Sequence, residues 1–202
     1  AIVLRYRQVP LRVTCLKASD NYPKRYATFV KTLKLIEPTT ELEEQYIQMI
    51  HDWDSTDEPK VPFQLNFDYS DFQSMVSILF ERKKGIGIPD NHVPVSTFWL
   101  IDQQNEILGV VNIKHRLTES LMLDGGHIGY GIRPSKRKKG YASKILELAL
   151  KEAKKLNIEK ALITCDKDNI ASSKTILNNN GILDKEYTHE GVSKQRYWIN
   201  VA

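Results

Sequence analysis

Apolar residues recur every three or four positions between residues 142 and 156, which is the strongest periodic pattern in the chain. In a helix these residues would share one face, and they are Ala142, Ile145, Leu146, Ala149, Leu150 and Ala153. Weaker patterns predict three further helices, each with a residue able to cap it at its start, over residues 40–53, 71–80 and 169–178.

Short runs rich in β-branched and aromatic residues predict strands between and around these helices. The runs are residues 35–37, 96–102, 107–115, 127–133, 161–165 and 196–200. Pro38 stops the first run, which is typical of an edge strand. The second and third runs are close enough in sequence to form an antiparallel hairpin. The order of the elements predicts a mixed α/β sheet with helices on its faces.

Composition limits the class of protein. A chain of 202 residues, with 41% apolar and 27% charged residues, suits one ordinary globular domain, alone or with an appendage. No apolar run reaches the roughly 18 residues that a membrane span needs. Two cysteines, Cys15 and Cys165, are too few for a disulfide framework or a structural zinc cluster. We therefore expect a cytoplasmic protein with no metal and no membrane partner.

The positive charge is concentrated at the beginning of the chain. Residues 1–34 hold eight basic residues and one acidic residue, a net charge of +7. Residues 35–202 hold 21 basic and 24 acidic residues, a net charge of −3. The sequence thus predicts a basic N-terminal extension over 1–34, either poorly ordered or docked as a short arm, and a domain over 35–202. Because the domain itself is not basic, we expect no nucleic-acid partner.

Residues 134–141 form a basic loop between a predicted strand and the strongest predicted helix. Gly140 allows the backbone to turn tightly and to approach a ligand closely. The helix that follows presents N–H groups and a partial positive charge at its start. Lys138 and Lys139 add positive charge, and Ala142 is too small to obstruct the helix end. This arrangement predicts a diphosphate site, although a solvated basic turn is the simpler alternative.

The segment Arg137-Lys138-Lys139-Gly140-Tyr141-Ala142 resembles the acetyl-CoA-binding signature of the GCN5-related N-acetyltransferases (GNAT). Residues 127–134 resemble the fourth strand of that family, and Asp168 to Ser172 resemble the Asn-x-x-Ser motif after its fifth strand. The resemblance covers about residues 35–202 and is nearest to an uncharacterised bacterial branch of predicted acetyltransferases.

The resemblance implies a mostly antiparallel central sheet with helices on both faces and with splayed fourth and fifth strands. Acetyl-CoA would lie in the gap, with its pantetheine arm paired to the fourth-strand backbone and its diphosphate on the loop. Asn169 would contact the cofactor or cap a helix, or do both. The cofactor-binding residues that the resemblance implies are Tyr130, Gly131, Ile132, Arg137, Lys138, Lys139, Gly140, Tyr141, Ala142, Ser143, Asn169 and Ser172.

Acetyl transfer to a primary amine by direct attack in a ternary complex needs a neutral amine, and therefore a base or a water chain. His127 is the first candidate for the catalytic base because imidazole titrates near neutral pH; a structural histidine is the alternative. His115 and Glu119 are lesser candidates. Many family members carry a tyrosine that acts as the general acid on the helix after the Asn motif, but this chain has none there. Tyr187 or Tyr197 would be the substitute, although a packing role is the simpler interpretation of each.

The acceptor is expected to be a small-molecule or peptide amine. Acidic residues near the first two helices would suit a cationic amine, although solvated loop carboxylates are the simpler interpretation; they are Asp52, Asp54, Asp57, Glu58, Asp68 and Asp71. A non-catalytic acyl-CoA-binding module is the main alternative function. The oligomeric state stays open, with a homodimer among the alternatives.

Overall fold

The computed structural model of the protein describes residues 32–201. They belong to a compact unit that extends from Lys31 to Ala202. The basic extension predicted for residues 1–34 therefore lies outside the described residues, except for its last three.

Within residues 32–201 seven strands form two antiparallel sheets. The first sheet has the order β1-β2-β3-β4, with β1 (Lys34–Ile36), β2 (Val95–Ile101), β3 (Ile107–Lys114) and β4 (Ile128–Ile132). The second has the order β5-β7-β6, with β5 (Lys160–Asp166), β6 (Ile182–His189) and β7 (Val192–Asn200). The predicted hairpin is present as β2 and β3, and the predicted edge strand is β1.

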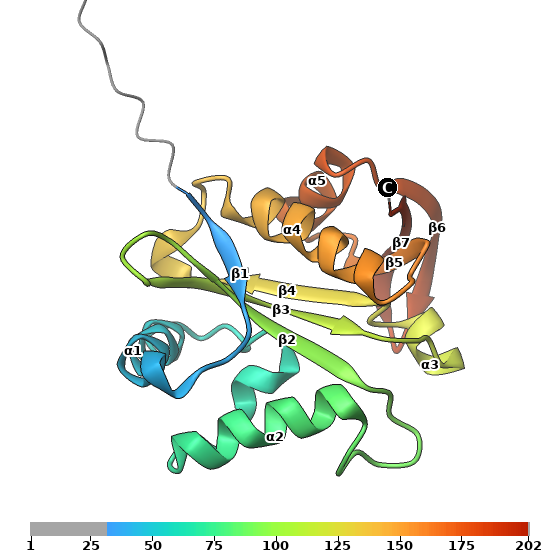
Figure 1. Cartoon of the computed structure of the whole chain (residues 1–202). Helices are drawn as coiled ribbons and strands as arrows, with labels where there is room; N and C mark the ends of the chain where they lie inside the picture. Colours follow the sequence, from blue (N-terminus) through green and yellow to red (C-terminus); the bar gives the residue numbers. More distant parts are fainter. Residues whose placement is uncertain (1–31, 202) are drawn as a thin grey trace, which may run out of the picture. The chain divides into compact units, whose positions relative to one another are not determined.

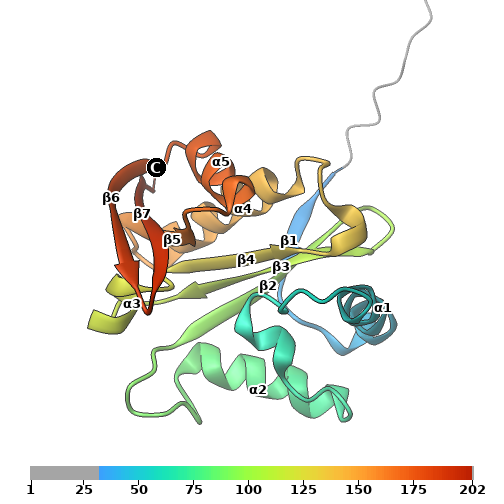
Figure 2. The same cartoon turned by 180° about the vertical axis from the view of Figure 1, so that it is seen from behind.

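Helices cover both faces of the first sheet. Figures 1 and 2 show α1 (Glu43–Asp54) and α2 (Phe72–Lys84) on one side, and α4 (Tyr141–Lys155) and α5 (Ile170–Asn178) on the other. A short helix, α3 (Glu119–Leu123), lies between β3 and β4 in the chain. Three single-turn 3₁₀ helices complete the described elements, at Thr40–Leu42, Phe63–Asn66 and Pro134–Lys136. This arrangement confirms the predicted α/β architecture.

Side-chain caps define the starts of three helical segments. Thr39 Oγ1 accepts a hydrogen bond from the Glu41 N–H, which begins the helical turn before α1. Asp71 Oδ1 accepts from the Ser74 N–H at 3.0 Å at the start of α2. Asn169 caps α5, as described with the site below. These caps are at the positions that the sequence predicts, because such side chains satisfy N–H groups that the first turn cannot.

Each face of the sheet has its own hydrophobic core. Trp99 and Val110 point to the α1 and α2 side, where they pack with Tyr46, Trp53 and Phe72. Alternate residues of the same strands point to the other side and pack against α4, whose apolar face includes Ile145, Leu146 and Ala149. Strand β3 contributes to both cores and β4 mainly to the core on the α4 side, and burial of these apolar side chains strongly favours the layered arrangement.

The sequence did not predict β6. Its side chains are mostly exposed, including the apolar Ile182 and Leu183. The remaining residues are mostly polar, so neither face of the strand is apolar. It is held by pairing with β7 and by side-chain contacts such as the ion pair between Arg196 and Asp184. Strand β7 also starts earlier than predicted, at Val192. An edge strand stabilised by its neighbour has no buried face of its own, so the hydrophobic pattern cannot reveal it.

Strands β4 and β5 meet at one end and then separate into different sheets. At the junction the His127 N–H donates to the Leu162 carbonyl at 2.7 Å. Gly126, with φ +57°, lies so close to this carbonyl that any side chain would collide with it. Beyond the junction β4 is the edge of the first sheet and β5 the edge of the second. The predicted splay of the fourth and fifth strands is therefore present.

Candidate functional site

The open edge of β4 presents backbone groups that do not pair with another strand. Arg133 N–H donates to the Leu108 carbonyl at 3.0 Å, and Lys114 N–H donates to the His127 carbonyl at 2.8 Å. These two residues flank β4, so the odd-numbered positions between them, Gly129 and Gly131, direct their backbone groups to β3. Backbone groups alternate in direction along a strand. Tyr130 and Ile132 therefore direct their N–H and carbonyl groups to the gap, whereas the backbone of Gly131, included in the predicted set, faces β3.

A first cavity, of about 480 Å³, begins at this edge and ends at the basic loop. Of the residues predicted to bind the cofactor, it brings together Tyr130, Gly131, Ile132, Arg137, Lys138, Gly140, Tyr141, Ala142, Ser143, Asn169 and Ser172. Lys139 is not part of the lining. The lining residues that sequence reasoning missed are Glu58, Val61, Lys136, Ala171 and Thr175. The size is within the usual range for ligand sites.

The turn before α4 needs glycine for its backbone conformation. Gly140 has φ +81° and Lys138 has φ +61°, so two left-handed residues reverse the chain within three positions. A side chain at Gly140 would meet no atom within 4 Å, which shows that space is not the constraint. The first bond of α4 joins Lys144 N–H to the Gly140 carbonyl at 3.2 Å, so the N–H groups of Ala142 and Ser143 have no partner within the helix.

Ion pairs engage Arg133, just before this loop, and half of the positive charges within it. Arg133 contacts Asp52 at 2.9 Å and Glu106 at 3.4 Å, and Lys136 contacts Glu106 at 2.6 Å. Arg137 contacts Glu58 at 2.6 Å. Within residues 32–201 no such acidic partner is found for Lys138 or Lys139. Two positive charges thus remain for an anionic ligand at the start of α4.

Arg137 holds the end of β4 in place. Its Nε donates to the Ile132 carbonyl at 3.1 Å, and its Nη1 donates to Glu58 at 2.8 Å. Its guanidinium also lies over the Trp53 ring, 5.9 Å from the ring centre. The side chain therefore joins the loop, the strand and α1, and Glu58 enters the cavity as its partner. No local motif could have identified Glu58, because the contact spans 79 residues of sequence.

Tyr130 places its hydroxyl in the gap. The Tyr130 hydroxyl is 3.3 Å from Ser172 Oγ, at the start of α5. Burial raises the pKa of Tyr130 to about 12, so its phenol stays protonated near neutral pH. Asn169 Oδ1 accepts from the Ser172 N–H at 3.0 Å, which is the capping role predicted as one of its alternatives.

The contacts of His127 are those of a structural histidine. It is 8% exposed, and its Nδ1 accepts the Leu162 N–H at 3.0 Å at the junction of β4 and β5. Burial, and to a lesser degree the charge of Lys114, lowers the pKa of His127 to about 4. It does not line the first cavity. These observations favour the structural alternative, because a base must accept a proton near the reacting atoms.

The other acid–base candidates also lie outside the first cavity. The Tyr187 hydroxyl donates to the Leu123 carbonyl, and the Tyr197 hydroxyl donates to Gln195 Oε1 at 2.7 Å. His115 Nε2 shares a hydrogen bond with Ser96 Oγ at 2.8 Å, and Glu119 is exposed on α3. Their described contacts are thus with other parts of the fold.

Most of the acidic residues near α1 and α2 have local partners. Although burial opposes it, hydrogen bonds from Ser135 and Arg133 lower the pKa of Asp52. Asp54 pairs with Lys60, and Glu58 with Arg137. Asp68 and Asp71 accept hydrogen bonds from the backbone two or three residues further on. These contacts favour the simpler interpretation of loop carboxylates over an acidic wall for a cationic amine.

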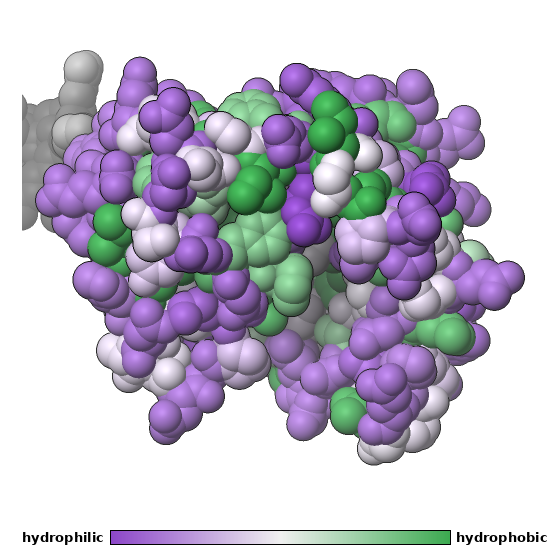
Figure 3. Space-filling model, turned by 90° about the horizontal axis from the view of Figure 1, so that it is seen from below, coloured by the Kyte–Doolittle hydropathy of each residue, from purple (hydrophilic) through white to green (hydrophobic). Residues whose placement is uncertain are grey.

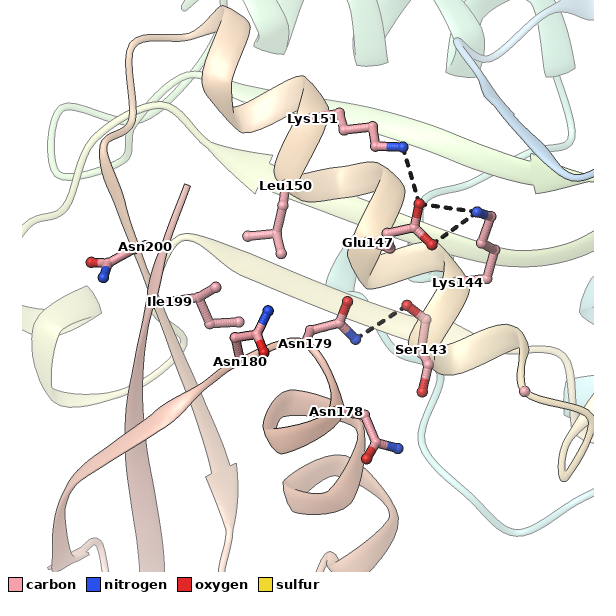
Figure 4. A pocket seen from close by; sticks show the side chains of 11 residues that line it. Ser143, Lys144, Glu147, Leu150, Lys151, Asn178, Asn179, Asn180, Ile199 and Asn200 are labelled. Atoms are coloured by element: carbon pink, nitrogen blue, oxygen red, sulfur yellow. Dashed lines mark hydrogen bonds and ion pairs between the residues drawn. The ribbon is translucent and has the colours of Figure 1, made fainter. Parts of the chain in front are cut away.

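An outer groove, of about 520 Å³, continues from the start of α4 toward the end of β7. Figure 4 shows its polar lining, in which Asn179 donates to the Ser143 carbonyl and Glu147 pairs with both Lys144 and Lys151. Gly140 and Ser143 line both the outer groove and the first cavity. The two spaces therefore adjoin at the basic loop.

Within residues 32–201 there is neither a membrane-spanning helix nor a metal-binding cluster. No described helix combines the length and the apolarity needed to cross a bilayer. No group of three or more histidine, cysteine or carboxylate side chains in this range is arranged to hold a metal ion.

A family model described as an acetyltransferase (GNAT) domain matches residues 33–181. Among solved structures, a microcin self-immunity acetyltransferase, MccE, in complex with acetyl-CoA and AMP shares 17% identity over 84% of this chain and 92% of its own, with a TM-score of 0.59. An acetyl transferase from Salmonella typhimurium that modifies the N-terminal serine of a 50S ribosomal subunit protein shares 17% identity over 85% and 96%, with a TM-score of 0.58.

A chimeric spermidine N-acetyltransferase, partly from Vibrio cholerae, shares 14% identity over 83% of this chain and 95% of its own, with a TM-score of 0.56. At such identities the similarity shows the fold. The comparison with curated protein sequences finds no significant match.

Proposed function

We propose that the chain, which belongs to the GCN5-related N-acetyltransferase (GNAT) family, transfers the acetyl group of acetyl-CoA to a primary amine by direct attack in a ternary complex. The observation that carries this proposal is one continuous cavity that joins the open edge of β4 to the glycine turn before α4. A cofactor with an amide-containing arm and a diphosphate needs these two features side by side.

The arm of the cofactor would lie along β4. Amide groups of pantetheine would pair with the backbone of Tyr130 and with the Ile132 N–H, as an added strand would. The diphosphate would accept hydrogen bonds from the N–H groups of Ala142 and Ser143, near Lys138 and Lys139. Because the first cavity ends at this loop, the nucleoside would extend into the outer groove, where Asn178, Asn180 and Asn200 offer polar side chains.

In the transfer step the amine nitrogen bonds to the acetyl carbonyl carbon and the carbon–sulfur bond breaks. The developing oxyanion would accept a hydrogen bond from a backbone N–H on the open edge of β4. The thiolate of coenzyme A leaves, and the proton lost by nitrogen reaches it through water. Tyr130 is suited to donate a hydrogen bond to this sulfur, because its hydroxyl keeps its proton.

Deprotonation of the amine is assigned to solvent. The one carboxylate in the described cavity lining, Glu58, is paired with Arg137. An amine with a pKa near 10.4 is neutral at a level of about 0.04% at pH 7. Turnover should therefore rise with pH through the range 7 to 9 in parallel with the neutral amine, with no inflection from a histidine.

The alternative is a module that binds acyl-CoA without catalysis. It is favoured by the absence of an unpaired base in the described lining of the first cavity. Calorimetry with acetyl-CoA, followed by an assay of free thiol release over a panel of amines, separates the two functions. Binding with turnover supports the enzyme, binding without turnover over the whole panel supports the module, and no binding would contradict both.

A further inference from the structure

A second cavity, of about 470 Å³, lies on the face of the sheet that α1 and α2 cover. It is bounded by the end of α2, the start of β2, the end of β3 and the start of α3. Viewed from the α1 and α2 side, the surface is hollowed near its centre (Figure 3). The described lining of the second cavity includes Arg82, Lys114 and His92 but no aspartate or glutamate. The electrostatic character of this space is therefore positive.

Two polar atoms in this lining are buried and have no partner among the described residues. Asn112 is 3% exposed; its Nδ2 donates to Gln64 Oε1, but its Oδ1 accepts nothing. Arg82 Nε is also buried without an acceptor, while its guanidinium lies over the Phe67 ring at 4.7 Å. Buried polar atoms are normally paired, because an unpaired one loses its bond to water without replacement. These atoms therefore indicate a missing partner.

Lys114 adds a second cation to the same lining. Burial lowers the pKa of Lys114, and the attraction of Asp124 only partly opposes this. Like Asn112, Lys114 lies on β3 with its side chain on the α1 and α2 face. Arg82 Nε, the buried donor without an acceptor, and the Lys114 ammonium group thus belong to the lining of the same cavity, which includes no described carboxylate. An anionic group would satisfy both.

The second cavity adjoins the first. Val61 lines the first cavity, and the next residue, Pro62, lines the second. Asn112 is the cross-strand partner of Gly129 on β4, so both share one face of the sheet. A side chain at Gly129 would meet only Pro62, at 4.0 Å, which leaves room beside the β4 backbone. A ligand in the second cavity can therefore extend toward β4 from the face opposite Tyr130.

We propose that the second cavity binds the acceptor, and that this acceptor is an amine that also carries an anionic group, either a carboxylate or a phosphate. Arg82 and Lys114 would hold the anion, and Asn112 Oδ1 would accept a hydrogen bond from the amine end. This inference rests on the proposed function and deepens it. It takes the place of the less favoured alternative from the sequence, an acidic wall for a cationic amine.

The test uses three series of amines with matched spacers of increasing length: simple alkylamines, ω-amino carboxylates and ω-aminoalkyl phosphates. Free thiol release with acetyl-CoA should give a kcat/KM roughly ten- to hundredfold higher for at least one anionic series than for the alkylamines. Arg82→Gln should remove this preference and leave the affinity for acetyl-CoA unchanged. Lys114→Gln should act in the same direction. Lys84→Gln, an exposed position in the same turn of α2, is the matched control.

Calorimetry of the same amines with the CoA-loaded chain keeps the inference testable without turnover. The inference is supported if an anionic series binds more tightly than the alkylamines and if Arg82→Gln abolishes this difference. Comparison of the amino carboxylates with the aminoalkyl phosphates then identifies the anion. If CoA binds but alkylamines bind or react as well as both anionic series, the inference is wrong although the proposed function stands. If CoA itself does not bind, the proposed function fails first.

Discussion

The first and second cavities differ in how their residues are distributed along the chain. The first is built mostly from two segments, residues 130–143, which begin within β4, and residues 169–175, which come soon after β5. The second collects short stretches and single residues from six parts of the chain, namely residues 62–64, the end of α2, the loop after it, the start of β2, the end of β3 and the start of α3. A site for a shared cofactor can be encoded in local backbone geometry, whereas a site for a particular acceptor depends on side chains that only the tertiary fold brings together.

The two cavities also differ in which groups do the binding. Around the first, N–H and carbonyl groups face the space, and the cations Arg133, Lys136 and Arg137 are already paired with acids. Around the second, the proposed binding groups are the side chains of Arg82, Asn112 and Lys114. Substitutions should therefore affect the first cavity mainly through backbone conformation and charge, and the second through loss of individual side-chain contacts.

The largest effect is expected from Gly140→Asp. It places a carboxylate where the diphosphate would lie and strains a residue with φ +81°, so the Kd for acetyl-CoA should rise by more than about 100-fold. Gly191→Asp is the matched control, because Gly191 has φ +80°, is equally uncrowded and lies in the β6–β7 turn. Calorimetry on both variants measures the difference. Unchanged affinity in Gly140→Asp would refute the assignment of the first cavity.

His127 tests whether the junction between the two sheets is structural. His127→Ala leaves the buried Leu162 N–H without its acceptor, so the free energy of unfolding should fall by about 1–3 kcal/mol. Turnover per folded molecule should stay within about twofold, and the exposed His51→Ala is the control. Denaturant unfolding and thiol release measure the two quantities. A large loss of turnover in a fully folded variant would restore His127 as the base.

The same residue predicts a pH dependence of stability. The pKa of His127 is about 4 in the fold, below the ordinary value of 6.5, so the unfolded chain takes up its proton first as pH falls. This contribution to stability is complete above pH 6.5 and is lost between about pH 6.5 and 4. In His127→Gln the decline over this window should be shallower, as measured by unfolding at a series of pH values. An identical slope in both proteins would contradict the structural role.

Tyr130→Phe separates chemistry from binding in the first cavity. Removal of the hydroxyl that lies near Ser172 should lower kcat by about tenfold, because a donor toward the leaving sulfur is lost, while the Kd for acetyl-CoA changes little. Tyr187→Phe is the control, since that hydroxyl bonds to the Leu123 carbonyl outside the cavity. If both variants behave alike, Tyr130 has only a packing role.

The sequence predicts well those features that depend on local pattern. The period of α4, the caps at Asp71 and Asn169 and the glycine turn at Gly140 are set by nearby residues, and each is present in the structure. The family and its fold follow from the same contiguous motifs, whereas the bacterial branch, the domain limits and the cofactor contacts remain predictions.

What the sequence cannot predict depends on contacts between distant segments. The buried position of His127 depends on Leu162, which is 35 residues away. Gly131 needs to be glycine because the Val61 carbonyl packs against it from the loop after α1. The ion pair between Arg137 and Glu58 likewise forms only when the chain has folded. A pattern of residue types records none of these distances, so the sequence alone gives a list of candidates and the structure decides which of them meet.

The smallest expected effect concerns the two lysines without acidic partners. Lys138 lines the first cavity and Lys139 does not, although the two are adjacent and neither has a described carboxylate partner. Lys138→Gln should weaken acetyl-CoA binding about two- to fivefold at low salt and less at high salt, because an exposed charge acts through screened attraction. Lys139→Gln should have a smaller effect at every salt concentration. Calorimetry over a salt series measures both, and a larger effect for Lys139 would mean that the diphosphate lies on the other side of the turn.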